Sequence, residues 1–573
     1  MKSTLLLALL ITLAPSATTA ADAQFRFKSD FLRQLVAEVP NALKGQDPGT
    51  GRFGSEGWDV RRQEVMFALA VAWATKSDNN PYYHDPKLLD VVMLAGDALA
   101  DDARQSGLMD YRKTGATPMP WTYSRWVRAY ALIKDAMPPE RREKWAETLE
   151  VAYSCVSENC IGFIQNIPAY QASGLYIAGQ ALDRPEWCAQ ARDFLYKVAK
   201  TQDPDGYWSE HDGPVVIYNT VYLDALGTYY AYSHDRGVIP YLKRAAIFHS
   251  NFTYPDGRPV ETIDERNLYN ENLNFGNIGF CLTAEGRGYL ANQLRLQKTY
   301  GMGPGIDNLA AFTLYGEEGP LIPTAAEAKN RTFVMKDKAM IRRKGPWFIC
   351  LSALCSPISG NRWIQDRQNM VSVYHDKCSL ILGGGNCKLQ PLWSNFTVGD
   401  ISLLKHAPGD TNPDFFPKGP LQHVPTAASL KETDPIGVNL EYGEEKCQVV
   451  VNPIDDNTLW IRVNATTATD RPVEGHITLR PVLSSPFRTE LTPARDLNAC
   501  EFDLSSKQAG AYIEHNGWRL TLPEGARVIW PAIPHYPYYT DGTPGRYFGR
   551  IVIALPFSKD KHEYALKLTV PPL

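Results

Sequence analysis

Apolar residues recur every three or four positions along the first half of the chain, between about Phe25 and Tyr315. The spacing is clearest in Val60–Thr75 (VRRQEVMFALAVAWAT) and Leu88–Arg104 (LLDVVMLAGDALADDAR), and it places apolar side chains on one face of a helix. Further helices are predicted at Tyr123–Ala136, Arg141–Val156, Pro168–Leu182, Glu186–Lys200, Pro214–Ser233, Ile239–Asn251 and Glu271–Gln297. Short loops join these roughly ten helices, so neighbours should pack antiparallel as hairpins. The pattern predicts an (α/α) toroid, an incomplete helical barrel, over residues 24–315.

The pattern changes after a break rich in turn formers, Gly316–Pro323 (GEEGPLIP), and residues 316–332 are predicted to form a linker. Apolar and polar residues then alternate in short runs, which Gly, Pro, Asn and Asp separate. The predicted strands are Phe333–Arg342, Trp347–Leu354, Met370–His375, Ser379–Leu382, Gln448–Pro453, Thr458–Asn464, Gly475–Arg480, Gly510–His515, Trp518–Leu522 and Arg550–Leu555. Such runs are typical of an antiparallel β-sandwich, here over residues 333–573. The predicted fold class is therefore multidomain α and β.

Residues 1–23 have the features of a secretory signal peptide. Lys2 supplies a positive start, Leu5–Leu13 a short apolar run, and Ala21-Asp22-Ala23 a small-x-small cleavage site. No later stretch of about 18 uncharged apolar residues is present, so no membrane span is expected. The mature protein is expected to be secreted or periplasmic.

Composition narrows the range of partners and cofactors. The net charge of −4 gives no global basic field, so nucleic acid is not an expected partner. The 13 Trp and 29 Tyr suit carbohydrate stacking, and they equally suit a large core. Export is compatible with local disulfides at Cys155–Cys160 and Cys350–Cys355, although buried thiols are the default interpretation. No zinc motif occurs, and we expect neither a metal nor another cofactor.

Four segments place polar or aromatic side chains where a loop enters a helix. They are Trp121–Trp126, Gln165–Pro168 with Asn166, Asp205–Pro214 (DGYWSEHDGP) with Trp208, Glu210 and His211, and Asp264–Asn270 with Arg266 and Tyr269. In a toroid of hairpins, alternate helix starts surround one rim, so these segments are expected to meet in one cleft. Helix N-termini carry unpaired N–H groups, which favour a bound carboxylate. Gln171 is included with Trp121, Trp208 and Glu210 among the residues expected to bind the ligand.

The candidate residues include an amide, a histidine, a tyrosine and an arginine, but no obvious nucleophile. This set fits β-elimination from a uronic acid. Removing the C5 proton puts negative charge onto the neighbouring carboxylate, which donors such as Asn166 and Arg266 stabilise. A base must take this proton and an acid must protonate the departing glycosidic oxygen. His211 and a tyrosine can share these roles, provided that a cation such as Arg266 makes the phenol more acidic.

The order of segments and these residues resemble the polysaccharide lyases that join an (α/α) toroid to an antiparallel β-sandwich. These include heparinase-type, hyaluronate and alginate lyases. The resemblance implies that Asn166 neutralises the carboxylate, while His211 and a tyrosine some fifty-odd residues away act as base and acid. Tyr269 lies 58 positions after His211 (269 − 211) and is the preferred tyrosine because Arg266 accompanies it. Families similar to hyaluronate lyase take the tyrosine from the helix just after the histidine, which leaves Tyr218 open.

A second stretch, Ser359–His375 followed by Gly383–Pro391, is similar to the part of heparinase-type sandwiches that meets the toroid. The resemblance implies that Arg362, Trp363 and Gln368 reach over the cleft and hold sugar. The alternative is a polar seam between the domains, with no contact to a ligand.

The sequence thus favours a secreted lyase that cuts an acidic polysaccharide such as alginate, glucuronan or a glycosaminoglycan. Two alternatives remain open. One is a glycoside hydrolase on the same toroid that uses Glu210 and Asp264, with Asp212 or Glu265 as substitutes. The other is a carbohydrate-binding protein without catalysis.

Overall fold

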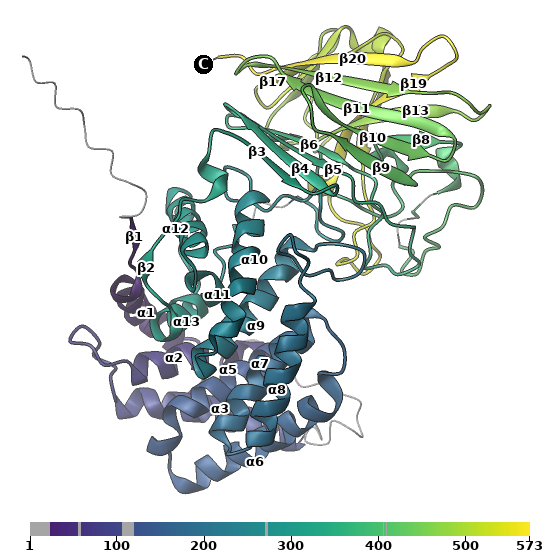
Figure 1. Cartoon of the computed structure of the whole chain (residues 1–573). Coiled ribbons are helices and arrows are strands. Elements are labelled where there is room, and N and C mark those ends of the chain that lie inside the picture. Colours follow the sequence, from purple (N-terminus) through teal and green to yellow (C-terminus); the bar gives the residue numbers. More distant parts are fainter. Residues whose placement is uncertain are drawn as a thin grey trace, which may run out of the picture.

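The computed structural model describes residues 23–54, 59–105, 120–269, 273–404, 406–407 and 409–572. Residues 1–22, which contain most of the predicted signal peptide, lie outside this part. A helical domain, purple to teal in Figure 1, is followed by a sandwich in green and yellow. The predicted fold class is confirmed: an N-terminal helical toroid precedes a C-terminal antiparallel β-sandwich.

The toroid consists of inner and outer helices that alternate along the chain. The inner helices are α2 (Val65–Ala74), α5 (Pro120–Ile133), α7 (Asn166–Ala181), α9 (Val216–Ser233), α11 (Ile278–Cys281) and α13 (Ile306–Tyr315). Each contacts the next, and α13 also contacts α2. The outer helices are α1 (Lys28–Leu43), α3 (Pro86–Gln105), α6 (Pro139–Cys155), α8 (Pro185–Lys200), α10 (Ile239–Asn251) and α12 (Ala284–Thr299). Successive inner helices run in the same direction, so their N-termini share one rim.

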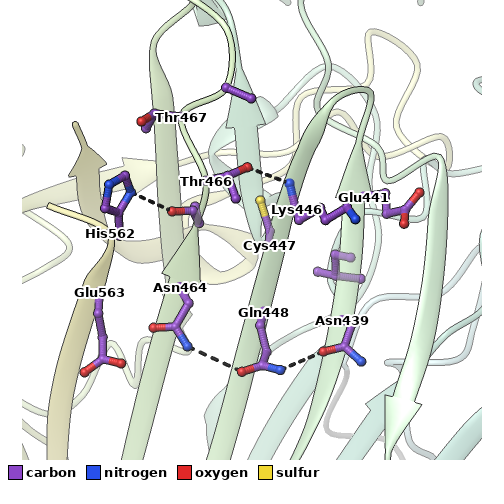
Figure 2. Close-up of a pocket in the computed structure, with 13 residues that line it drawn as sticks. Asn439, Glu441, Lys446, Cys447, Gln448, Asn464, Thr466, Thr467, His562 and Glu563 are labelled. Carbon is purple, nitrogen blue, oxygen red and sulfur yellow. Dashed lines mark hydrogen bonds between the residues drawn. The ribbon is translucent and has the colours of Figure 1, made fainter. Parts of the chain in front are cut away.

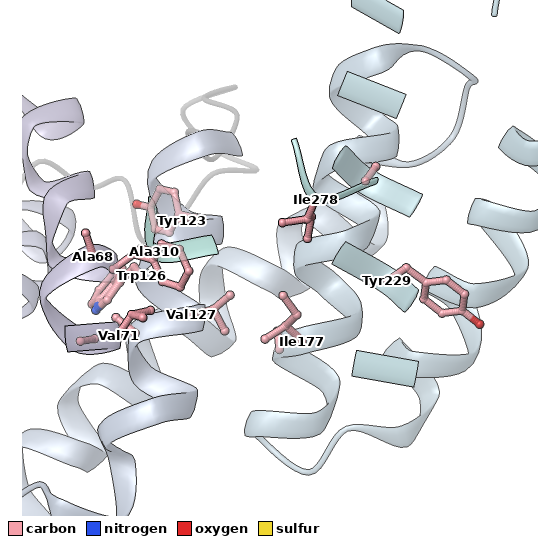
Figure 3. Close-up of a cluster of buried hydrophobic side chains, with 14 of the residues drawn as sticks. Ala68, Val71, Tyr123, Trp126, Val127, Ile177, Tyr229, Ile278 and Ala310 are labelled. Atoms are coloured by element: carbon pink, nitrogen blue, oxygen red, sulfur yellow. The ribbon is translucent and has the colours of Figure 1, made fainter. Parts of the chain in front are cut away.

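The core of the toroid lies between the inner and outer helices. Figure 3 shows its inner part, where Trp126 of α5, Val71 of α2 and Ile177 of α7 are fully buried. Close approach of α3 and α6 depends on Gly96: a Cβ there would lie 1.9 Å from the buried Trp145 ring. The Trp145 indole in turn donates a hydrogen bond to Asp97 at 2.9 Å. Ion pairs also join the two helices, among them Arg141 with Asp97 at 3.1 Å and Lys144 with Asp101 at 2.7 Å, so the pair is fixed by shape and by polar contacts.

Two predicted elements are wrong in the same way, because a turn interrupts each of them. The predicted helix Glu271–Gln297 begins outside the described residues. Its described part, residues 273–297, contains α11 and α12 as separate helices, since Thr283 leaves the helix and its hydroxyl caps Gly286 N–H at 3.1 Å. The predicted strand Phe333–Arg342 is the hairpin of β3 (Asn330–Met335) and β4 (Ala339–Lys344), with Lys336 at a positive φ of 47° in the turn. In the second segment the exposed Lys336 and Asp337 separate the buried Met335 and Ala339, so a charged interruption of the apolar run marks the turn.

The sandwich consists of two sheets, and a two-stranded pair, β1 (Gln24–Phe25) with β2 (Gly319–Pro320), lies apart from it. The first sheet has the order β14-β16-β17-β20-β12-β11-β10-β9 and the second β15-β18-β19-β13-β7-β6-β5-β4-β3, with β8 on β13. The remaining bounds are β5 (Trp347–Ser352), β6 (Val371–His375), β7 (Ser379–Leu382), β8 (Phe396–Val398), β9 (Ala427–Lys431), β10 (Ile436–Tyr442), β11 (Glu445–Pro453), β12 (Thr458–Ala465), β13 (Val473–Leu479), β14 (Phe487–Thr489), β15 (Phe502–Ser505), β16 (Tyr512–His515), β17 (Trp518–Thr521), β18 (Arg527–Ala532), β19 (Arg550–Phe557) and β20 (Glu563–Thr569).

The second sheet is covered on both faces, because its outer face packs against the toroid. Every residue of β5 and β6 is buried. The Tyr254 ring stacks on Tyr374 with centroids 5.2 Å apart, and its hydroxyl oxygen lies 3.0 Å from both Glu261 Oε2 and Ser372 Oγ. The two domains therefore share a buried seam, and this seam fixes how the sandwich loops face the rim.

All ten cysteines lie in the described part of the chain, and all are thiols there. The optional disulfides Cys155–Cys160 and Cys350–Cys355 are not formed. Among the described helices, none has the length and apolar character needed to cross a membrane.

Candidate active site

A cavity of about 530 Å³ lies where the rim of the toroid meets the sandwich loops. The residues that line it are Trp121, Gln165, Asn166, Ile167, Glu210, His211, Tyr218, Val221, Arg266, Asn361, Trp363 and Tyr538. The first eight come from the starts of α5, α7 and α9 and from the loops before them, Arg266 comes from the loop between α10 and α11, and the last three come from the sandwich. The structure therefore brings three of the four predicted segments together with Arg266 of the fourth.

Asn166 is the first residue of α7, and a buried carboxyl fixes its amide. Its Nδ2 donates to Glu210 Oε2 at 2.8 Å, and Tyr222 donates to Glu210 Oε1 at 2.8 Å. Burial raises the pKa of Glu210 above its ordinary value, while the bonds from Tyr222 and Asn166 oppose that rise. The amide has a second N–H, so Asn166 can donate to a ligand without leaving Glu210.

The loop that presents His211 is clamped to the helix that follows it. Asn219 of α9 is fully buried, accepts from Trp208 N–H at 2.6 Å and donates to Trp208 C=O at 3.0 Å. Asp264 Oδ2 accepts the Val216 N–H at 2.7 Å at the start of α9. The loop residues before α9 are thereby held at the rim, with His211 in the cavity.

Arg266 lies next to both His211 and Tyr218. Its Nη2 is 3.3 Å from His211 Nε2, and its Cζ lies 4.9 Å from the centroid of the Tyr218 ring. A guanidinium can only donate, so His211 Nε2 accepts in this contact. Burial lowers the pKa of His211, and the Arg266 charge lowers it further against a smaller opposite effect of Asp212. A neutral imidazole is the form that can take up a proton.

The position of Arg266 depends on contacts from both domains. Its backbone N–H donates to Asp264 Oδ1 at 2.8 Å, and its Nε donates to Trp363 C=O of the sandwich at 3.1 Å. Asp264 is only 2% exposed and thus organises the turn that carries Arg266 and the start of α9. Its role is structural.

The sandwich contributes two exposed rings to the cavity. Trp363 and Tyr538 lie edge to face with centroids 5.4 Å apart, and the Tyr538 hydroxyl is 2.5 Å from that of Tyr218. Arg362 does not line the cavity. It packs on Trp363 with its Cζ 5.5 Å from the ring centroid and donates to the carbonyls of Pro537 and Tyr539 at 3.1 and 2.9 Å. The predicted sugar contact by Arg362 is therefore replaced by a role in holding the two rings.

Tyr269, the preferred catalytic tyrosine, does not reach the cavity. It is 3% exposed, its N–H donates to Gly384 C=O at 3.2 Å, and Arg480 covers its ring at 4.7 Å. Its hydroxyl points to Asp256 Oδ2 at 3.4 Å within the seam. Between Arg266 and Tyr269 the chain passes from the rim into the seam between the domains. The preference for Tyr269 is therefore corrected in favour of Tyr218.

Three further expected ligand contacts are buried elsewhere. Trp208 is 1% exposed, stacks on Tyr222 and donates to Val198 C=O at 2.8 Å. Gln171 is 4% exposed in α7, and Gln368 is fully buried with its amide on Cys387. Trp121 and Trp363 do line the cavity, so two of the predicted aromatic contacts remain candidates.

The carboxylates needed for a hydrolase are not paired at the cavity. Of the four candidates, Glu210 alone is among the described residues that line it. Asp264 binds backbone N–H groups, and Glu265 is 1% exposed, 3.4 Å from Arg367 Nη2. Asp212 is exposed outside the lining. The described residues also contain no group of three or more His, Cys, Asp or Glu side chains that could hold a metal ion.

The sequence analysis does not include Tyr538 among the site residues. Tyr538 lies 320 positions after Tyr218, and no local pattern links it to the rim. The available signal was the aromatic run Tyr536-Pro-Tyr-Tyr539 in a loop. Aromatic side chains in a loop that flanks a sheet are candidates for a binding surface.

A second, larger groove of about 840 Å³ lies on the outer face of the sandwich (Figure 2). Asn439, Gln448 and Asn464 are cross-strand neighbours on β10, β11 and β12. Gln448 donates to Asn439 at 2.7 Å, and Asn464 donates to Gln448 at 3.4 Å. The amides thus bond to one another, and none of the predicted site residues lies there.

Comparisons with known proteins place the fold. No family model matches the chain, and no curated protein matches it in sequence. Among solved structures, a heparinase III aligns with a TM-score of 0.50 at 12% identity, over 94% of this chain and 83% of its own. A Paenibacillus xanthan lyase aligns with a TM-score of 0.55 at 11% identity, over 95% of this chain and 57% of its own. The toroid followed by a sandwich is therefore the fold of these two polysaccharide lyases.

Proposed function

We propose that this chain, with its heparinase-like fold, is a polysaccharide lyase that cleaves an acidic polysaccharide at a uronic acid by β-elimination. The observation that carries the proposal is the meeting of Asn166, His211, Tyr218 and Arg266 around one cavity. No pair of carboxylates lines that cavity among the described residues, and the four groups match the needs of elimination. The structural relatives are named as lyases of heparin and xanthan, which supports the same reaction class.

The carboxylate of the bound uronate is the group to which Asn166 and Arg266 donate. Negative charge develops there as the C5 proton leaves, and each aligned donor contributes roughly 3 kcal/mol to stabilising it. Arg266 contacts His211 Nε2 in the unliganded protein. The anionic carboxylate is a stronger acceptor than imidazole, so substrate binding should draw the guanidinium away and release this nitrogen.

His211 then takes the C5 proton, and Tyr218 gives its proton to the glycosidic oxygen. The C5–H and C4–O bonds break, a C4=C5 double bond forms, and the leaving sugar departs as an alcohol. Arg266 favours this direction because a cation beside a phenol stabilises the phenolate that remains. Trp121, Trp363 and Tyr538 surround the site with rings on which sugars can stack.

The charge of the cavity favours a substrate without sulfate at the cleaved unit. Arg266 is the only Lys or Arg among the described residues that line it, and Glu210 lies next to Asn166. One cation matches one uronate carboxylate, whereas sulfate groups would call for further cations. Alginate or glucuronan therefore fits better than a heavily sulfated glycosaminoglycan.

The test is to incubate the full chain with alginate, glucuronan, a pectin-like polymer, and sulfated and unsulfated glycosaminoglycans. A lyase produces new ultraviolet absorbance from the conjugated double bond, and we expect it with an unsulfated substrate. New reducing ends without this absorbance would identify a hydrolase, and saccharide binding without products would identify a binding protein.

We also propose a secreted or periplasmic location, because residues 1–23 have the features of a signal peptide. N-terminal sequencing of the exported protein tests this location, and an uncleaved N-terminus would contradict it.

A further inference from the structure

The hydroxyl groups of two tyrosines from different domains meet at the edge of the cavity. Tyr218 Oη in α9 and Tyr538 Oη in the sandwich loop are 2.5 Å apart. This distance is at the short end for O–H···O hydrogen bonds, in the range found when one oxygen carries charge. The contact is thus suited to stabilising a phenolate on either ring.

The loop holds Tyr538 firmly while leaving one side of its ring in solvent. Arg362 binds the carbonyls on both sides of it, those of Pro537 and Tyr539. The Tyr538 ring also packs against Tyr536, with centroids 5.2 Å apart, and against Trp363. Tyr538 nevertheless remains 46% exposed. Its hydroxyl therefore connects a cavity residue to bulk water at a fixed position.

We propose that Tyr538 is a positioning residue which relays protons between Tyr218 and solvent during turnover. This inference rests on the proposed lyase function. When Tyr218 has protonated the leaving oxygen, its own oxygen is a phenolate. Tyr538 donates a hydrogen bond to that phenolate, passes its proton across, and recovers one from water.

The proton balance of the cycle closes without another reactant. The C5 proton on His211 is released to solvent, and Tyr218 regains one proton from solvent through Tyr538. The N–H bond on His211 breaks as water takes its proton, and each transfer from water through Tyr538 to Tyr218 breaks one O–H bond and forms another, so no proton is gained or lost overall. Burial raises the pKa of Tyr538 and the Tyr218 hydroxyl raises it further, so Tyr538 is protonated when the phenolate forms on Tyr218. For the same reason Tyr538 takes a proton from water as it gives its own to Tyr218, and no free phenolate forms on Tyr538.

A ligand-binding role for Tyr538 alone would predict a different outcome from a relay. Loss of a sugar-stacking ring raises KM, but Tyr538→Phe keeps the ring and removes only the hydroxyl. Loss of a relay lowers kcat and leaves KM nearly unchanged. Small proton donors dissolved in the buffer can then replace the missing hydroxyl, which a purely structural defect would not allow.

The experiment compares full-length wild type, Tyr538→Phe and the matched control Tyr539→Phe on the substrate that gives ultraviolet absorbance. Tyr539 is 39% exposed in the same loop, and it binds Arg362 through its backbone carbonyl. We expect kcat of Tyr538→Phe to fall about ten- to a hundredfold, the effect of losing a hydrogen bond to a charged oxygen. Imidazole or phosphate at rising concentration and fixed pH should restore part of it. Tyr539→Phe should match wild type.

The outcomes separate the two proposals. If wild type forms no unsaturated product with any polymer, the lyase function fails and the relay with it. If wild type is active and Tyr538→Phe equals it, or loses kcat without any rescue by buffer, the relay is refuted and the lyase function stands. A rise in KM alone would assign Tyr538 to sugar binding and would also overturn the relay.

Discussion

Two tyrosines, Tyr218 and Tyr269, test whether the cavity is the site of chemistry. Phenylalanine at either position removes one hydroxyl and keeps the ring. The Tyr218 hydroxyl lies at the cavity and contacts Tyr538, whereas the Tyr269 hydroxyl lies in the buried seam and contacts Asp256. The two substitutions are chemically identical and differ only in place, so they form a matched pair.

The expected effects follow from these surroundings. Tyr218→Phe removes the proposed general acid, which is worth about 10² to 10⁴ in rate, or about 3 to 5 kcal/mol. Its hydroxyl lies in a half-exposed contact, so the free energy of unfolding should change by less than about 1 kcal/mol. Tyr269→Phe removes a long hydrogen bond of 3.4 Å, and Asp256 keeps Arg258 at 2.8 Å. It should lower stability by about 1 kcal/mol and leave kcat near that of wild type.

Initial rates from ultraviolet absorbance and urea unfolding curves measure both quantities on the same preparations. Calorimetry measures the binding of the intact polymer to Tyr218→Phe and checks that the variant still recognises substrate. The reasoning would be refuted if Tyr218→Phe kept wild-type turnover while Tyr269→Phe lost it. That result would return the acid to Tyr269 and would mean that the seam opens in the working enzyme.

Two further substitutions test the charges around the site and in the seam. His211→Ala should lower kcat by about 10² to 10⁴. Because burial and Arg266 lower the pKa of His211, kcat/KM of wild type should hold down to pH 6.5 and fall only below it; an acid limb above pH 6.5 would contradict this. Burial raises the pKa of Glu261 from 4.5 to about 7, so the stability that its protonated form contributes is present below pH 4.5 and lost as pH rises through about 7. The free energy of unfolding of Glu261→Gln in urea, relative to that of wild type, should therefore rise by about 3 kcal/mol between pH 4.5 and pH 8. A difference that does not change with pH would show that Glu261 is not held in a desolvated state.

Much of the fold is predictable because the period of apolar residues is a local property. The range Ile239–Asn251 was predicted for α10 and is the range observed. Errors arise where a short polar cap interrupts a continuing pattern, as at Thr283 between α11 and α12. They arise also at the turn between β3 and β4, where Lys336 has a positive φ of 47°. Period alone does not show where a short turn divides one predicted element into two.

The sequence predicts those site residues that lie at the starts of helices, because proline and glycine mark these starts. Asn166 and His211 were found because Pro168 and Gly213-Pro214 mark the entry to α7 and α9. Trp208 was misplaced because successive side chains of an extended loop point to opposite sides, and the sequence does not say which side faces the core. Its ring enters the core beside Tyr222, while His211, three residues later, faces the cavity.

The position of the cleft explains why the toroid needs the sandwich. Arg266 is the proposed anchor for the substrate carboxylate, and Trp363 C=O holds its Nε. Arg367 of the same sandwich segment is 1% exposed and donates to Ile263 C=O at 3.0 Å, so it fixes the chain just before Arg266. A Cβ on Gly213 would lie 2.3 Å from Arg367 Nη2, so the His211 loop also rests against this residue. The sandwich thus places the loops that carry Arg266 and His211, and with them the alignment of the groups on which the proposed elimination depends.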